Sequence, residues 1–168
     1  MNRLLRILKH RAWDDTDTRR AIGPDVLRRL QQRVQTSERQ HSGEIRVCVE
    51  AGLPLSYLWR GLSARDRAIT MFGKLRVWDT EHNNGVLIYL LLAEHAIEIV
   101  ADRGLNAHVS AAQWAAIIDT MREAFKARRH EQGLHAAIDA VDALLRQHFA
   151  LAAGQHNPNE LPDEPALR

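Results

Sequence analysis

The segment WDTEHNNGVLIYLLL, residues 78–92, joins a polar loop to the most apolar stretch of the chain. From Val86 to Leu92 the one polar group on a side chain is the hydroxyl of Tyr89. A short run that is apolar on both faces is typical of a strand inside a sheet covered on both sides. It is far shorter than the roughly 20 apolar residues that a membrane-spanning helix needs. The segment therefore predicts a layered domain with a buried central strand.

Two further strands are indicated by the sequence. EIRVCVE, residues 44–50, alternates apolar and polar side chains, as a strand with one buried face does. AIEIVA, residues 96–101, follows 86–92 after a short turn, which predicts an antiparallel hairpin. Apolar stripes and capping patterns predict helices at 24–41, from Ser63 to about 75, from Ser110 to about 125 and from about 134 to 149, with a loop at 52–61.

The order of these elements fixes the fold class. Strands 44–50 and 86–92 are separated by a helix, so they are expected to pair in parallel through a right-handed crossover. Adding the antiparallel strand 96–101 gives an α/β fold with a small mixed β-sheet flanked by helices.

Three regions are distinguished along the chain. Residues 1–22 form a basic amphipathic N-terminal segment, with a leucine-rich helix followed by the polar linker DDTDTRR. Residues 23–150 form the folded domain. Residues 151–168 are predicted to be a disordered tail, because they are rich in Pro, Asn and acidic residues and have little to bury.

Charge and composition limit the expected partners and compartment. The net charge is +2, and residues 1–40 hold ten Lys and Arg against five Asp and Glu. No basic stripe with interleaved aromatic residues is present, so no nucleic-acid partner is expected. The single cysteine, Cys48, excludes an intramolecular disulfide, and the N-terminus lacks the pattern of a secretory signal. We therefore expect a cytoplasmic protein, peripheral to the inner face of the membrane if it meets one.

The expected topology brings polar residues from three segments to one end of the sheet. Residue 44 begins one strand, residues 79–84 lead into its parallel neighbour, and residues 101–110 leave the antiparallel strand at that same end. The side chains gathered there are Glu44, Asp79, Asn83, Asn84, Asp102, Arg103 and Asn106.

Two interpretations of this group remain open. Carboxylate and amide oxygens suit Ca²⁺ or Mg²⁺, whereas Arg103 and the start of the helix capped by Ser110 suit a phosphate. The predicted metal ligands are Glu44, Asp79, Asn83, Asn84 and Asp102, and the catalytic candidates are Asp79, Asp102 and Arg103. The alternative is purely structural: Asn-Asn-Gly is a turn sequence, Asp79 caps that turn, and Asp102 pairs with Arg103.

The same segments resemble the TPM domain family over about residues 24–149. The resemblance is carried by Glu44-Ile45, NNGVLIYLLL, EIVADRGL and the two C-terminal amphipathic helices. It implies an α/β sandwich with a central sheet. Family members are described as acid phosphatases, as calcium-binding proteins and as accessory factors of membrane protein complexes.

The chain departs from the family pattern at the expected site. Asn83 and Asn106 stand where many members have carboxylates, and Arg103 adds a positive charge. We therefore expect a binding or accessory module for a membrane-associated complex, with a membrane-protein partner and weak membrane-surface contact through residues 1–13. The alternative is a metal-dependent acid phosphatase that uses Ca²⁺ or Mg²⁺.

Overall fold

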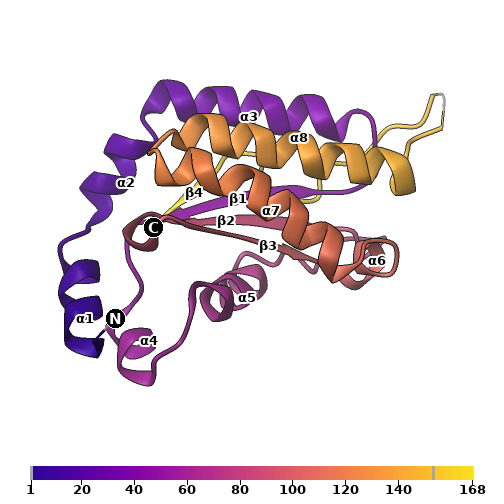
Figure 1. Cartoon of the computed structure of the whole chain (residues 1–168). Coiled ribbons are helices and arrows are strands. Elements are labelled where there is room, and N and C mark those ends of the chain that lie inside the picture. The colour runs from indigo at the N-terminus through magenta and orange to yellow at the C-terminus, as the bar shows by residue number, and fades with distance from the viewer. Residues whose placement is uncertain (1, 153) are drawn as a thin grey trace.

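The computed structural model describes residues 2–152 and 154–168, which form a four-stranded sheet with helices on both faces (Figure 1). The strand order is β3-β2-β1-β4, with β1 at Ile45–Glu50, β2 at Val86–Leu91, β3 at Ala96–Ala101 and β4 at Ala166–Leu167. β1 runs parallel to β2 and β4, whereas β3 runs antiparallel to β2. The predicted mixed α/β fold, including the hairpin, is confirmed.

The helices form two unequal layers. One face of the sheet is covered by α3 (Pro24–Glu38), α7 (Ala111–Lys126) and α8 (His130–Phe149), and the other by α5 (Ala64–Lys74) (Figure 1). The shorter elements are α1 (Arg3–Arg11), α2 (Asp15–Ala21), α4 (Leu55–Arg60), the 3₁₀ turn η1 (Leu92–Glu94) and α6 (Arg103–Asn106). No helix in the described ranges has the length and apolarity needed to cross a membrane.

β2 is the strand on which both layers are built. All six of its residues are buried. Alternate side chains, at 86, 88 and 90, join the apolar core shared with α3, α7 and α8, and those at 87, 89 and 91 join the core shared with α5. Since burying one such side chain contributes roughly 1.5–3 kcal/mol, removing either layer would expose half of the strand at a large cost.

A buried ion pair lies within the α5 layer. Arg67 of α5 donates to both carboxylate oxygens of Glu50, with Nε to Oε2 at 2.9 Å and Nη2 to Oε1 at 2.6 Å. Tyr89 of β2 donates its hydroxyl to Glu50 Oε2 at 2.6 Å. The guanidinium also lies 5.2 Å from the ring centroid of Tyr57. This bidentate ion pair compensates the charge of a carboxylate that would otherwise be buried without a partner.

A second polar cluster joins α3 to α8. Ser37 donates its hydroxyl to Asp142 Oδ1 at 2.6 Å and lies 2.8 Å from His41 Nε2. Burial lowers the pKa of His41 to about 4, so the ring is neutral at physiological pH. Ser37 and His41 are fully buried, so we interpret the cluster as a structural clamp between the two helices.

The C-terminal segment differs from the prediction of a disordered tail. Residues 151–168, of which 153 lies outside the described residues, run along the domain and supply β4. The side chain of Arg46 on β1 donates to the backbone carbonyls of Pro162 and Glu164, and Leu161 is buried. These contacts join parts of the chain more than 100 residues apart.

The N-terminal half also contains more helix than the sequence predicted. DDTDTRR, expected to be a linker, forms α2, because Asp14 and Asp17 make a reciprocal capping box at its start. The loop expected at 52–61 contains α4, and the last helix begins at His130 rather than near residue 134. The expected helix at the N-terminus is present as α1.

The buried ion pair leads to a test of its contribution to stability. We expect Arg67→Ala to lower the free energy of unfolding by about 3–5 kcal/mol, because it leaves the Glu50 carboxylate buried without its cation. The control is Arg65→Ala, which removes an exposed arginine from the same helix and should cost about 0–1 kcal/mol. Urea unfolding followed by circular dichroism measures both. Equal losses in the two variants would contradict this assignment.

Candidate functional site

The residues predicted to form a site do lie toward one end of the sheet. The backbone N–H of Val86 donates to the carbonyl of Glu44 at 2.8 Å, so the starts of β1 and β2 are adjacent. The N–H of Asp102 donates to the carbonyl of Gly85 at 2.9 Å, which brings the end of β3 to the same place. The topology argued from the sequence is therefore the one the chain adopts.

Two glycines allow the polar loop to sit directly on this end. A side chain built on Gly85 would place its Cβ 2.0 Å from the carbonyl oxygen of Val77. A side chain on Gly104 would place its Cβ 2.5 Å from the carbonyl oxygen of Asn83, which accepts from the Gly104 N–H at 2.8 Å. The loop follows the end of the sheet so closely because its backbone packs against backbone.

The exposed candidates are each held by a local partner. Asp79 forms an ion pair with Arg76 at 2.6 Å. Arg103 Nε donates to Asn83 Oδ1 at 3.0 Å. Asp102 is half-buried: its Oδ1 accepts from the backbone N–H of Arg103 at 2.7 Å and caps α6, and its Oδ2 has no hydrogen-bond partner in the described residues. These contacts differ from the expected structural ones, because Asp79 pairs with Arg76 and Asp102 caps a helix rather than forming an ion pair with Arg103.

The buried candidates are also tied to neighbours. Glu44 accepts from Asn157 Nδ2 and from the backbone N–H of Leu161, both at 3.2 Å. Asn84 Nδ2 donates to Ser42 Oγ at 3.2 Å, whereas Asn84 Oδ1 is buried without a hydrogen-bond partner in the described residues. In the described part of the chain, no three His, Cys, Asp or Glu side chains are arranged to hold a metal ion. The three predicted carboxylate ligands, Glu44, Asp79 and Asp102, therefore do not form one such group, and a site that also uses the oxygens of Asn83 and Asn84 stays a prediction.

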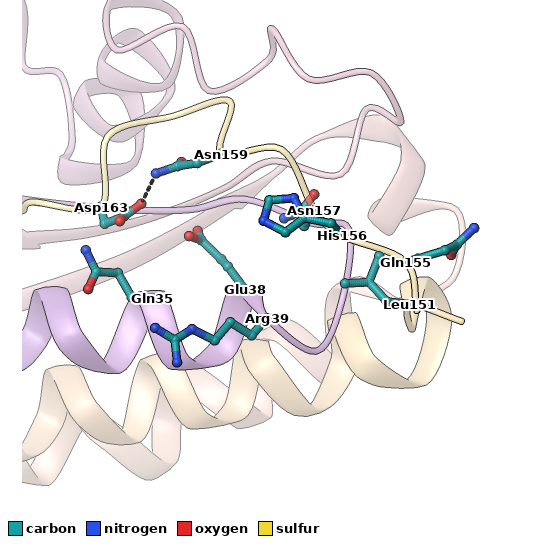
Figure 2. Close-up of a pocket in the computed structure, with 9 residues that line it drawn as sticks. All are labelled: Gln35, Glu38, Arg39, Leu151, Gln155, His156, Asn157, Asn159 and Asp163. Carbon is teal, nitrogen blue, oxygen red and sulfur yellow. Dashed lines mark hydrogen bonds between the residues drawn. The ribbon is translucent and has the colours of Figure 1, made fainter. Parts of the chain in front are cut away.

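A cavity of about 380 Å³ lies between the C-terminal end of α3 and the C-terminal segment (Figure 2), and Asn157, which donates to Glu44, is part of its lining. Glu38 reaches into this region from α3, with Asn157, Asn159 and Asp163 supplied by the tail (Figure 2). The sequence interpretation missed these residues, because it placed Glu38 within the helix at 24–41 without singling it out and assigned the tail to disorder.

Burial dominates the electrostatics of this cavity. It raises the pKa of Glu38 to about 9, with a further contribution from the charge of Glu44. It also raises the pKa of Glu44 to about 7. One oxygen of Glu38 accepts from the backbone N–H of Ile45 at 2.8 Å. Glu38 is therefore protonated at neutral pH, an unusual state for a carboxyl group at a cavity.

The remaining candidate groups have simpler surroundings. Cys48 is fully buried in β1, and burial raises the pKa of its thiol to about 12, as expected for an inert cysteine. His82 lines a second cavity, of about 410 Å³, together with His148 and His156. His108 stacks on His148 with ring centroids 4.8 Å apart.

The raised pKa of Glu38 predicts a pH dependence of stability. The folded-state pKa lies above the ordinary value of 4.5, so this group contributes stability that is complete below about pH 4.5 and is lost as pH rises through about 9. Glu38→Gln removes that dependence while keeping an acceptor for Ile45. We expect the variant to melt higher than the unmodified protein by roughly 3–8 °C at pH 9 and by much less at pH 5.

Differential scanning calorimetry at pH 5, 7 and 9 measures this difference. Glu123→Gln, which changes an exposed glutamate on α7, is the matched control and should show no such divergence. A constant difference between Glu38→Gln and the unmodified protein across the three pH values would refute a protonated Glu38.

Comparison with known proteins places this geometry in a family. A family model described as TPM domain matches residues 16–144. The chain is similar to the BA42 protein of the psychrophilic bacterium Bizionia argentinensis, with 26% identity and a TM-score of 0.74 over 86% of this chain and 94% of that one. No curated protein matches the chain.

A second structure supports the fold alone. The N-terminal domain of a protein from P. gingivalis is 19% identical, with a TM-score of 0.56 over 72% of this chain and 76% of that one. The family match spans most of the sequence and includes the whole of β1, β2 and β3. The chain belongs to the TPM domain family.

Proposed function

We propose that this chain is a noncatalytic TPM-type binding module that serves as an accessory factor for a membrane-associated complex. The observation that carries the proposal is an apolar surface on two neighbouring helices, α1 and α4 (Figure 1). Five large apolar side chains there are between 47% and 66% exposed. This α1–α4 surface consists of Leu4, Leu5, Leu8, Leu55 and Trp59.

The charges around this surface favour an anionic partner. Residues 1–13 and 51–65 contain no Asp or Glu, and their basic residues are Arg3, Arg6, Lys9, Arg11, Arg60 and Arg65; of these, Arg6 pairs with Glu94 and Arg65 with Glu98. Exposed leucines and a tryptophan on segments that also carry Arg and Lys are typical of a surface that meets anionic lipid headgroups or the membrane-proximal part of a protein. A membrane-located partner therefore suits this side of the module.

Polar contacts hold α1 in place with its leucines outward. His10 Nδ1 accepts from the backbone N–H of Leu53 at 3.0 Å, and Glu94 Oε1 lies 2.7 Å from Arg6 Nε and 2.9 Å from His10 Nε2. Ile7 is partly buried against the α5-layer core. The inward side of α1 is therefore already satisfied, which leaves the exposed leucines available to a partner.

The phosphatase alternative has weaker support. A phosphate-binding arginine must be available to substrate, yet Arg103 is engaged by Asn83 and Asp79 is engaged by Arg76. Both contacts lie at exposed positions, so substrate could compete for them only at the cost of breaking them. The carboxyl pair Glu38 and Glu44 lies apart, beneath the C-terminal segment.

The noncatalytic assignment predicts a negative enzymatic result. With Ca²⁺ or Mg²⁺ present, we expect hydrolysis of p-nitrophenyl phosphate to be absent or slight between pH 5 and 9. The same residual rate should be seen in Asp79→Ala and in Arg76→Ala, because neither residue is assigned a role in hydrolysis and both variants remove the same ion pair. A robust turnover that disappears in Asp79→Ala alone would reverse the order of the two functions.

The accessory role predicts binding to an anionic surface. Vesicles of phosphatidylcholine with phosphatidylglycerol should retain the protein at low salt and release much of it at high salt, because each basic residue near such a surface contributes only about 1 kcal/mol. Leu4→Ser with Leu8→Ser should lower the bound fraction strongly. Cosedimentation measures both effects.

The matched pair for this experiment is Trp59→Ala and Trp78→Ala. Both indoles are about half exposed, at 58% and 50%, but Trp78 lies in the loop before β2. The first variant should bind vesicles at least about threefold more weakly and the second should not change. Identical behaviour of the two variants would remove the α1–α4 surface from the proposal.

A further inference from the structure

The cavity between the end of α3 and the C-terminal segment has a strongly polar lining (Figure 2). Eight of the nine side chains that line it carry an amide, carboxyl, guanidinium or imidazole group, and the ninth is Leu151. Sites for small molecules have volumes of roughly 300–1,000 Å³ and are usually lined mainly by apolar side chains. At about 380 Å³ this cavity has a suitable volume, but its lining suits a ligand that is polar over most of its surface.

Both walls of the cavity are held in place by contacts within the chain. One wall is the last turn of α3, a helix that packs on α8. The other wall is tied down at each end, because the N–H of Leu151 donates to the carbonyl of Gln40 and the N–H of Leu161 donates to Glu44, both at 3.2 Å. Between these points Asn157 Nδ2 donates to Glu44 at 3.2 Å. A site whose walls are already ordered loses less entropy when a ligand binds.

A buried carboxyl group reaches into this cavity from α3. Glu38 is 8% exposed, and its Oε1 accepts from the backbone N–H of Ile45 at 2.8 Å. Its other oxygen accepts no hydrogen bond from a described residue. Asp163, which accepts from Asn159 Nδ2 at 3.0 Å, faces it across the cavity (Figure 2). A carboxyl group that is nine-tenths buried needs a polar partner at each oxygen, and a ligand in the cavity can supply the second one.

Other polar groups of the lining also have free hydrogen-bonding capacity. The side chains of Gln35, Arg39 and His156 have no hydrogen-bond or ion-pair partner among the residues that the structure describes. The side-chain oxygens of Asn157 and Asn159 likewise accept no hydrogen bond from those residues, although both Nδ2 groups donate. The cavity therefore presents donors and acceptors from both of its walls.

The charges of the lining favour a neutral ligand. Burial raises the pKa of Glu38 to about 9, so this group is neutral at physiological pH. The remaining formal charges are the guanidinium of Arg39 and the carboxylate of Asp163, which have opposite signs. A lining with little net charge attracts neither anions nor cations strongly.

We propose that this cavity binds a sugar. A hydroxyl group donates and accepts at the same atom, so it can pair with amide, carboxyl and imidazole groups alike. Neighbouring hydroxyls of a pyranose ring match the two oxygens of one carboxyl group, or the oxygen and NH₂ of one amide. The site goes beyond the proposed function and uses none of the side chains of the α1–α4 surface.

The sugar can be a free monosaccharide or the end of a glycan chain. The second cavity, of about 410 Å³, shares four lining residues with the first, so a further ring has space beside the first one. Both sources present the same hydroxyl chemistry to the residues of α3.

The test is an NMR titration of the full chain with glucose, galactose, mannose and N-acetylglucosamine. We expect at least one of these sugars to produce saturable shifts of the side-chain NH₂ signals of Gln35, Asn157 and Asn159. Gln35→Ala with Asn159→Ala should weaken binding at least about tenfold, because two hydrogen bonds to the ligand are lost. The control, Gln32→Ala with Gln132→Ala, removes two exposed glutamines outside the cavity and should leave the affinity unchanged.

Two substitutions of Glu38 distinguish contact with the ligand from support of the fold. Glu38→Gln keeps a neutral group that accepts from Ile45 and donates into the cavity, so it should bind the sugar about as well as the unmodified protein. Glu38→Ala should bind at least about tenfold more weakly. Thermal melting shows whether Glu38→Ala is folded, and if it is not, the double variant of Gln35 and Asn159 decides the question.

Maltose, lactose and diacetylchitobiose separate the two sources of the sugar. A disaccharide that binds more tightly than its monosaccharides identifies the end of a glycan chain, and equal or weaker binding identifies a site for free sugars. Absence of saturable shifts with every sugar, or equal affinity in the two double variants, would overturn the proposal. Shifts of the same signals with calcium chloride alone would replace the sugar by a cation. Vesicle binding through the α1–α4 surface can succeed or fail independently, because these variants leave that surface unchanged.

Discussion

The burial of β2 on both faces is the constraint on which the rest of the structure depends. Because no residue of this strand reaches solvent, each face requires its own layer of helices, and the neighbouring strands must pair along its full length. Polar loops can then join this strand only where it begins and ends. This is why a loop as polar as residues 78–84 enters so apolar a strand, and why Gly85, where no Cβ fits, stands between them.

The two layers differ in how they treat charge. The layer of α3, α7 and α8 keeps its polar groups at helix contacts, as in the Ser37 to Asp142 hydrogen bond, whereas the α5 layer encloses the Glu50–Arg67 pair. A buried pair of this kind favours a single register of α5 on the sheet, because any shift would separate the two charges. Packing alone would tolerate small shifts of a largely aliphatic interface.

The sequence predicted those features that depend on local patterns. Strand periodicity and chain order determine the pairing of β1, β2 and β3, so these could be predicted. The Asp14 and Asp17 capping box at α2 was also visible but was overlooked. The position of the tail could not be predicted, since it depends on contacts such as Arg46 with Glu164 across the whole chain. For the same reason the sequence pointed to Glu44 and missed Glu38 and the tail residues around it.

The two ends of the sheet differ in what they expose. At the polar end, Asp79, Arg103 and Glu44 each have an intramolecular partner, and the oxygens without a hydrogen-bond partner in the described residues, Asn84 Oδ1 and Asp102 Oδ2, are buried. At the other end, the leucines of α1 are exposed. Exposed apolar area lowers the stability of the isolated domain, and binding to a partner relieves this cost. The physical case for binding a protein or membrane partner is therefore stronger at the end where the parallel strands finish, although the conspicuous sequence motif lies where they start.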